Sequence, residues 1–175
     1  MYNKRGQFFL IISVIIIGLV AGLATITNSV QKQSDVKFYY VGEELKFESE
    51  KVIDYGIANN KDMKQLLTDF SQDYSKYSNA DNFYYVFGTT SEITFAGLKK
   101  KNSGTVNVDF DSSGNGIDIT LNQDIFTIKE IAVSSLTGTL TIEGVIYPLI
   151  LKQGQNFFFV VSKEIEGNVY TVTNG

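Results

Sequence analysis

The spacing of hydrophobic and polar residues divides the chain into three parts. Residues 8–26 are almost entirely apolar and contain no charged residue and no proline. As a helix that rises ~1.5 Å per residue, this segment would extend about 28 Å, close to the hydrocarbon thickness of a bilayer. Residues 38–77 place apolar side chains at helical spacing, and after residue 82 the period changes to two. The pattern therefore predicts a membrane helix, a helical middle part and a strand-rich part, in that order.

Two helices fit the middle part. In residues 38–58, Phe38 and Leu45 begin an apolar stripe that Val52 continues, and Gly56 is typical of a helix end. Four glutamates of this segment are interpreted as a solvated face rather than an acidic site: Glu43, Glu44, Glu48 and Glu50. The second helix fits residues 62–77, where six apolar residues recur every three or four positions: Met63, Leu66, Leu67, Phe70, Tyr74 and Tyr77. We expect this second stripe to cover a sheet rather than to form a partner's groove.

Short strands are predicted beyond residue 82, separated by turns rich in Gly, Asn and Ser. The expected strands are residues 83–87, 91–96, 105–109, 116–121, 125–131, 138–147, 156–162 and 170–173. The uninterrupted apolar run Phe157–Val161 is typical of a central strand or of an interface. Sequential short strands favour an antiparallel sheet or sandwich. The lysines 99–101 are interpreted as a solvated loop tip.

The expected fold class is α+β, with an N-terminal transmembrane and stalk helix, a short helical neck, and then an antiparallel β-sheet or sandwich domain. The predicted boundaries are a basic leader at 1–6, the transmembrane and stalk helix at 7–34, the neck packing on the sheet at 35–80, and the β-domain at 81–175.

Composition excludes several classes of function. The chain contains no histidine and no cysteine, which removes the commonest general base, thiol catalysis and most transition-metal sites. Residues 35–175 hold 12 basic and 19 acidic residues, a net charge of −7, so we expect no nucleic-acid binding. No spacing of carboxylates or hydroxyls nominates a catalytic set. The sequence therefore predicts that the protein is not an enzyme and needs no cofactor.

One stretch matches the opening of a calcium loop. Residues 109–114 offer oxygen ligands at alternate positions, followed by Gly114 at the tight turn. The twelfth position of such a loop is Thr120, however, where a bidentate glutamate would be needed, and the stretch continues into a predicted strand. We interpret it as a hairpin, and no metal site is predicted.

The residues before the apolar segment indicate orientation and processing. Lys4 and Arg5 precede it directly, which places the N-terminus in the cytoplasm and the C-terminal domain outside the cell membrane in a single pass. The junction of Lys4, Arg5, Gly6 and Gln7 with the apolar run resembles the class III signal peptide of archaeal type IV pilin-like proteins. The resemblance covers roughly 30 residues. It implies cleavage between Gly6 and Gln7 by a prepilin-type peptidase, with the helix retained on the mature protein.

The same resemblance bears on self-assembly. Bacterial-type pilins carry a glutamate at the fifth mature position, which here is Ile11, and archaeal flagellar subunits lack it too. Gly18 and Gly22 form a Gly-x-x-x-Gly motif, which allows close packing between membrane helices. The anchor followed by the helix ending at residues 51–56 also looks like small uncharacterised archaeal surface proteins.

These features predict a membrane-anchored, pilin-like cell-surface structural protein that becomes a filament subunit after cleavage. Two alternatives stay open. One is a monomeric single-pass membrane protein with an extracytoplasmic binding domain. The other is a secreted domain cleaved after Ala24, because Gly22-Leu23-Ala24 matches the small-x-small site of a secretory signal.

Overall fold

The computed structural model describes residues 17, 38–110, 116–151 and 156–174. The chain divides into two compact units, Met1–Lys37 and Phe38–Gly175, and every helix and strand discussed below belongs to the second. Lys4, Arg5, Gly6, Gln7, Gly18 and Gly22 lie outside the described residues. The same holds for the predicted membrane segment 8–26, apart from residue 17. Within the described ranges, no helix is long and apolar enough to cross a membrane.

In the unit that begins at Phe38, the described residues form two helices and nine strands. The first helix occupies residues 38–58, and α2 follows at Met63–Tyr77. The strands are β1 (Asn82–Gly88), β2 (Glu92–Lys99), β3 (Gly104–Asp109), β4 (Ile117–Leu121), β5 (Thr127–Ala132), β6 (Thr137–Ile142), β7 (Val145–Ile150), β8 (Phe157–Ile165) and β9 (Asn168–Thr173). Five of them form an antiparallel sheet in the order β5-β2-β1-β8-β9, and four form a second one in the order β4-β3-β6-β7. The class is α+β with a β-rich domain.

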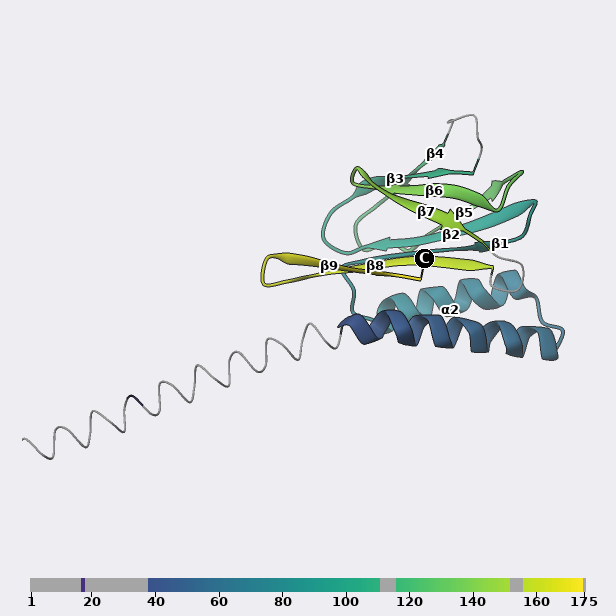
Figure 1. Ribbon diagram of the computed structural model, residues 1–175, viewed down its shortest axis with the longest axis horizontal. Helices are drawn as coiled ribbons and strands as arrows, with labels where there is room; N and C mark the ends of the chain where they lie inside the picture. Colours follow the sequence, from purple (N-terminus) through teal and green to yellow (C-terminus); the bar gives the residue numbers. More distant parts are fainter. Residues whose placement is uncertain (1–16, 18–37, 111–115, 152–155, 175) are drawn as a thin grey trace, which may run out of the picture. The chain divides into compact units, whose positions relative to one another are not determined.

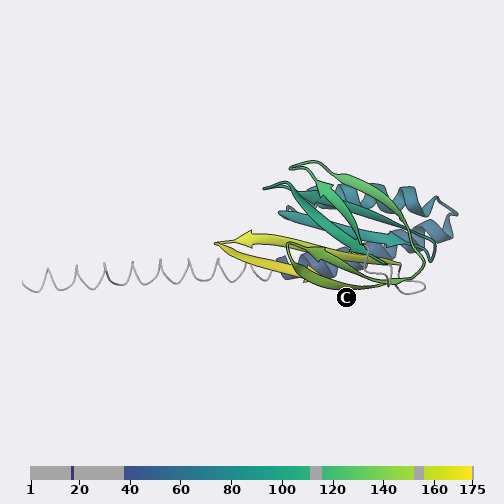
Figure 2. The same ribbon diagram turned by 90° about the horizontal axis from the view of Figure 1, so that it is seen from above.

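The elements form three layers (Figures 1 and 2). The two helices lie on one face of the five-stranded sheet, and the four-stranded sheet lies on the other. Each contact between layers holds its own hydrophobic cluster: one lies between the sheets and the other between the helices and the five-stranded sheet. The central strands β1, β2 and β8 of the five-stranded sheet are therefore buried on both faces over most of their length, and strands covered on both faces are near-continuous apolar runs.

Neighbouring residues of the central strands serve different clusters. In β1, Tyr84 joins the cluster between the sheets, whereas Tyr85 joins the one beneath the helices. The strand β8 lies between β1 and β9, and all five side chains of Phe157–Val161 are buried. The apolar run thus belongs to a central strand, which confirms the first of the two interpretations made from the sequence.

The helices follow most of the predicted pattern, but Tyr77 of the second predicted stripe is 68% exposed. In the first helix, the buried positions Phe38, Gly42, Leu45 and Ser49 recur every three or four residues. A Cβ atom added at Gly42 would lie 3.0 Å from Cβ of Val172, so the absent side chain lets the helix approach β9. In α2, the buried side chains include Leu67 and Tyr74, as expected for a helix that covers a sheet.

One predicted strand was wrong. Residues 138–147 are not a single strand but the hairpin of β6 and β7. Glu143 and Gly144 have φ angles of 51° and 84°, the positive values that a two-residue type I′ turn requires. As a consequence Val145 starts a new strand and is 53% exposed.

Candidate functional site

Two candidate sites considered from the sequence are the glutamates of the first helix and the calcium-loop stretch 109–114. The glutamates of the first helix are exposed, and Oε1 of Glu44 accepts a hydrogen bond from the Tyr77 hydroxyl at 3.2 Å. Residues 111–115 of the calcium-loop candidate lie outside the described ranges, while Phe110 packs between the sheets. No group of three or more carboxylates that could hold a metal occurs among the residues that are described.

A cleft of about 490 Å³ lies where the two helices meet the hairpin of β1 and β2. We call it the helix-end cleft. Apolar side chains of both helices and of β1 line much of it, among them Ile53, Met63, Leu67 and Phe87. Polar residues of its lining include Lys64, Thr89, Ser91 and Glu92. It is an apolar depression beside a strip of charges and hydroxyl groups.

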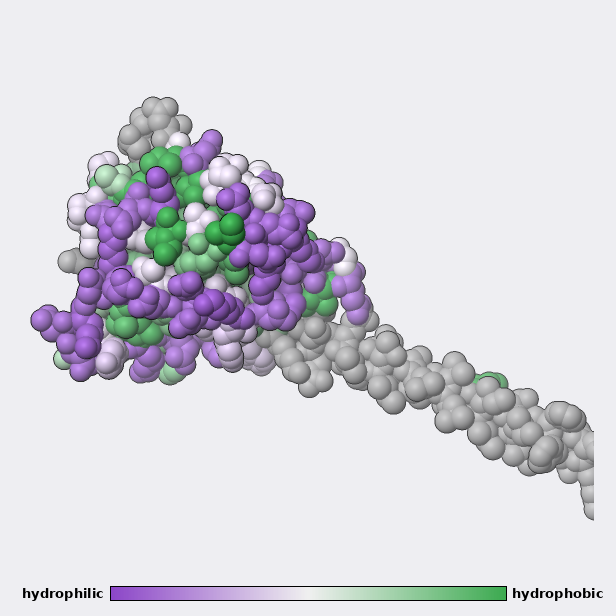
Figure 3. Space-filling model, turned by 180° about the vertical axis from the view of Figure 1, so that it is seen from behind, coloured by the Kyte–Doolittle hydropathy of each residue, from purple (hydrophilic) through white to green (hydrophobic). Residues whose placement is uncertain are grey.

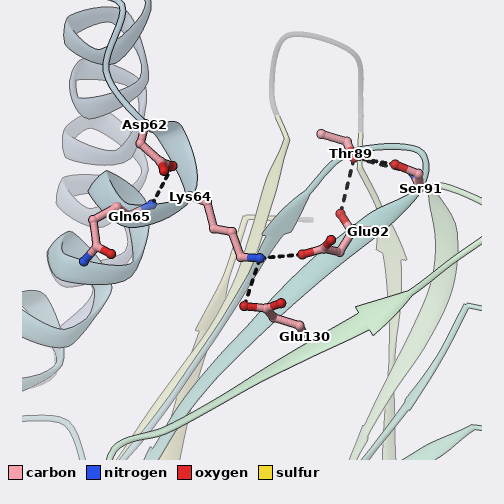
Figure 4. A network of polar contacts seen from close by, with 7 residues as sticks. All are labelled: Asp62, Lys64, Gln65, Thr89, Ser91, Glu92 and Glu130. Atoms are coloured by element: carbon pink, nitrogen blue, oxygen red, sulfur yellow. Dashed lines mark hydrogen bonds and ion pairs between the residues drawn. The ribbon is translucent and has the colours of Figure 1, made fainter.

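Figure 4 shows how the polar side of this cleft is fixed. The ammonium of Lys64, in α2, lies 2.6 Å from Oε1 of Glu92 and 2.8 Å from Oε1 of Glu130, which belong to β2 and β5. The hydrogen bonds to Glu130 and then Glu92 raise the pKa of Lys64. Thr89 and Ser91 share a hydrogen bond of 3.2 Å in the turn between β1 and β2. The ion pairs of Lys64 join the helix layer to the sheet, and the charges of Lys64, Glu92 and Glu130 already have partners.

A second pocket, of about 400 Å³, opens between the two sheets near β9 and the β6–β7 turn. We call it the inter-sheet pocket. It is lined by Asp81, Asn82, Tyr84, Lys99, Lys101, Asn102, Ile142, Glu143, Val145, Tyr147, Val160, Ser162, Glu164, Val169 and Thr171. The residues come from both sheets, and more than half of them are polar or charged.

Two groups of ion pairs organise the inter-sheet pocket. The ammonium of Lys99 lies 2.6 Å from Oε1 of Glu143, and the two side chains are 6% and 66% exposed. Lys101 contacts Asp81 at 3.2 Å and Glu164 at 3.0 Å. The sequence-based interpretation of lysines 99–101 as a solvated loop tip is therefore wrong for Lys99. That residue ends β2 and is covered by the turn of the opposite sheet.

Tyr84 is one of the most buried residues that line this pocket. Its side chain is 1% exposed, and its hydroxyl makes no hydrogen bond to any described residue. Burial, followed by the nearby charge of Glu143, raises the pKa of the Tyr84 hydroxyl well above its ordinary value. Beside it, Nδ2 of Asn82 donates to Oγ of Ser162 at 3.0 Å. The pocket thus combines four hydroxyl groups, two amides, two ammonium groups and three carboxylates.

Large apolar side chains are also exposed on the outside of the molecule. On the first helix they are Tyr39, Tyr40, Phe47, Tyr55 and Ile57. Figure 3 shows another gathering of hydrophobic residues, surrounded by hydrophilic ones, on the far side of the molecule from the viewer of Figure 1. Exposed apolar side chains near the edges of the sheets include Ile117, Ile128, Ile146 and Ile150. These surfaces are available for contacts with other molecules.

Comparisons with known proteins give no indication of the family of this protein. No protein-family model, no curated protein and no solved structure matches the sequence or the fold.

Sequence reasoning missed the inter-sheet pocket. Lys99 and Glu143 are 44 positions apart, and only the stacking of two sheets brings them together. The one available signal was a lysine that directly follows the apolar run of β2.

Proposed function

We propose that the protein is a membrane-anchored, pilin-like cell-surface structural protein, cleaved between Gly6 and Gln7 and able to self-associate through its N-terminal helix. The observation that carries the proposal is the sequence Lys4-Arg5-Gly6-Gln7 followed by the uncharged segment 8–26. A bilayer accommodates an apolar helix of about this length. The basic residues before it favour a cytoplasmic N-terminus.

In this proposal residues 1–6 are the leader, and residues 7–34 form the transmembrane and stalk helix. The compact unit that begins at Phe38 then lies outside the cell. Two features of that unit support a structural role: the exposed aromatic residues of its first helix, and an acidic surface that suits solvent. The peptidase that removes the leader and the membrane are the expected partners, and subunits would meet through Gly18 and Gly22.

The N-terminal residue of protein recovered from native membranes tests the anchor. Mass spectrometry is expected to find Gln7 as the first residue. Gly6→Val should block the cut, since a branched side chain at the scissile position hinders an extended backbone in a peptidase cleft. The matched control is Ala24→Val, which alters the rival secretory site and should leave the start at Gln7 unchanged.

The other outcomes identify the rivals. A start at Met1 in the wild-type protein would contradict the pilin-like proposal and favour the monomeric single-pass protein. A start at Thr25 would favour the secreted domain.

Self-association is tested separately. Gly18→Leu with Gly22→Leu should abolish cross-linked oligomers and any filaments seen by electron microscopy, because leucine keeps the helices apart. The control is Val20→Leu, which lies between the two glycines in sequence and changes volume without filling that face. Equal cross-linking of all three proteins would contradict assembly through the motif.

The monomeric binding protein is the second candidate, and the inter-sheet pocket favours it. A pocket of about 400 Å³ has the size of a small-molecule site, and its polar side chains could fix the orientation of a ligand. The two candidates do not exclude one another, because a surface subunit can also bind a ligand.

A further inference from the structure

The hydroxyl of Tyr84 is the least satisfied group in the inter-sheet pocket. A buried hydroxyl without a hydrogen bond is costly, and native proteins contain few of them. This one belongs to a side chain that is 1% exposed and is part of the lining of the inter-sheet pocket, and the hydroxyl oxygen itself is shielded from solvent. A ligand that donates to the hydroxyl, or accepts from it, would satisfy it.

The charges around that hydroxyl restrict the chemistry of such a ligand. Five charged residues line the pocket: Asp81, Lys99, Lys101, Glu143 and Glu164. Both lysines are already in ion pairs. An anionic ligand would therefore have to displace a carboxylate from a lysine, and a cationic ligand would have to displace a lysine ammonium from a carboxylate. The sum of the charges is −1, which further disfavours anions. A neutral ligand leaves these ion pairs intact, including that of Lys99, the one of these charged side chains that is buried.

Neutral hydroxyl groups of a ligand can form hydrogen bonds at the donor and acceptor positions that the ion pairs of the pocket do not use. A carboxylate has about four lone-pair positions, and Glu143, which is largely exposed, uses one oxygen for Lys99. The remaining positions can accept hydrogen bonds from ligand hydroxyls. Tyr84, Asn82 and Ser162 add groups that donate as well as accept. Such a mixture fits a ligand whose every polar group is both donor and acceptor.

The walls of the pocket agree with this class of ligand. Tyr147 is partly buried and lines the pocket together with Val145 and Val169, so it offers an apolar side to the C–H groups of a ring. The helix-end cleft differs, because its lining is mainly apolar and its charged strip is closed by Lys64. We propose that the inter-sheet pocket binds a neutral polyhydroxylated ring, that is, one unit of a saccharide.

The proposal can be tested on the full chain in phosphatidylcholine nanodiscs, which carry no sugar head groups. The probes are glucose, galactose, mannose and N-acetylglucosamine, with glucuronate and glucosamine as charged counterparts. Saturation-transfer NMR and titration calorimetry measure binding. At least one neutral sugar is expected to bind with a Kd below ~10 mM, and the charged counterparts about fivefold or more weakly.

Two tyrosine variants locate the site. Tyr84→Phe removes only the hydroxyl and should weaken the binding of the neutral sugar at least about fivefold. Tyr85→Phe is the matched control: it is the next residue of β1, equally buried, with a hydroxyl that also makes no described hydrogen bond, but it faces the helices. It should bind the sugar as the wild type does. Glu143→Gln, on the other sheet, should also weaken binding.

Three results would overturn the proposal. The first is no binding of any neutral probe up to ~100 mM. The second is equal affinity of the wild type and Tyr84→Phe, which would place the sugar elsewhere. The third is tighter binding of a charged counterpart. Because the pocket lies wholly within residues 81–171, none of these results depends on whether the leader is cleaved.

Discussion

At the scale of single residues, two adjacent tyrosines have different surroundings because successive side chains of a strand point to opposite faces of the sheet. Tyr84 and Tyr85 are both buried aromatic residues whose hydroxyls make no hydrogen bond to a described residue. One faces a pocket lined by five charged residues, and the other faces the apolar layer beneath the helices. Only Tyr84 is therefore placed to meet a ligand, although the two residues are indistinguishable in the sequence.

Both tyrosines make the fold sensitive to alkaline pH. Burial raises the pKa of each hydroxyl above the ~10 of an unfolded chain, with Glu143 adding to the effect at Tyr84 and the Ser49 hydroxyl opposing it at Tyr85. Above pH ~10 the unfolded chain loses protons that the folded protein keeps, so the unfolding free energy falls as pH rises. Each tyrosine contributes a slope of roughly 1.4 kcal/mol per pH unit.

Urea unfolding between pH 8 and about 11 measures this slope. The stabilisation should be fully present below pH ~10 and decline above it. In the double variant Tyr84→Phe/Tyr85→Phe the decline should be shallower by both contributions. An identical pH profile for the variant and the wild type would contradict the argument.

Gly138 gives a second prediction at this scale. A Cβ atom added there would lie 2.2 Å from the carbonyl oxygen of Asp109 and 2.8 Å from the ring of Phe110. Since the first contact is with backbone, Gly138→Ala should lower the unfolding free energy by ~3 kcal/mol or more. Gly144→Ala is the control. It meets no atom within 4 Å and suffers only from its φ of 84°, so it should cost about 1 kcal/mol. Equal losses in urea unfolding would contradict this ranking.

At the scale of elements, α2 begins at a residue that the sequence identified. Asp62 precedes the first helical residue, and its Oδ1 accepts a hydrogen bond from the backbone N–H of Gln65 at 3.1 Å. This contact satisfies one of the N–H groups that the first turn of a helix leaves free.

Removal of this cap should destabilise the protein measurably. Asp62→Ala is expected to lower the unfolding free energy by about 1 kcal/mol, as at other helix N-caps. Asp62→Asn is the matched control, because its amide oxygen can accept the same bond, and it should retain most of the stability. The midpoints of urea unfolding of the two variants measure this difference in stability. A loss in Asp62→Asn as large as that in Asp62→Ala would show that the cap is not responsible.

Elements whose own segment carries a pattern of apolar residues could be predicted from the sequence. Features that depend on contacts with residues far away in the sequence could not. The stripe of α2 and the apolar run of β8 identified a covering helix and a central strand because periodicity and burial act within one segment. The turn at Glu143 was missed, since glutamate rarely adopts positive φ and gives no turn signal. Lys99 was misplaced because its burial depends on the second sheet.

At the scale of the whole molecule, both hydrophobic clusters are closed within residues 38–175. One is completed by the four-stranded sheet and the other by the two helices. Among the described residues, neither cluster includes one before Phe38, and the compact unit begins at that residue. The fold of this unit should therefore not need the N-terminal segment.

A fragment of residues 38–175 tests this independence. It should unfold in urea in one cooperative transition, with far-UV and near-UV circular dichroism changing together, because a single-domain chain of this size is usually two-state. A fragment of residues 62–175 is the informative comparison. Without the first helix it exposes the apolar face that Phe38 and Leu45 cover, so it should aggregate or lose its near-UV signal. If the longer fragment also lacked a near-UV signal, the N-terminal segment would be part of the folding unit, and the boundary at Phe38 would be wrong.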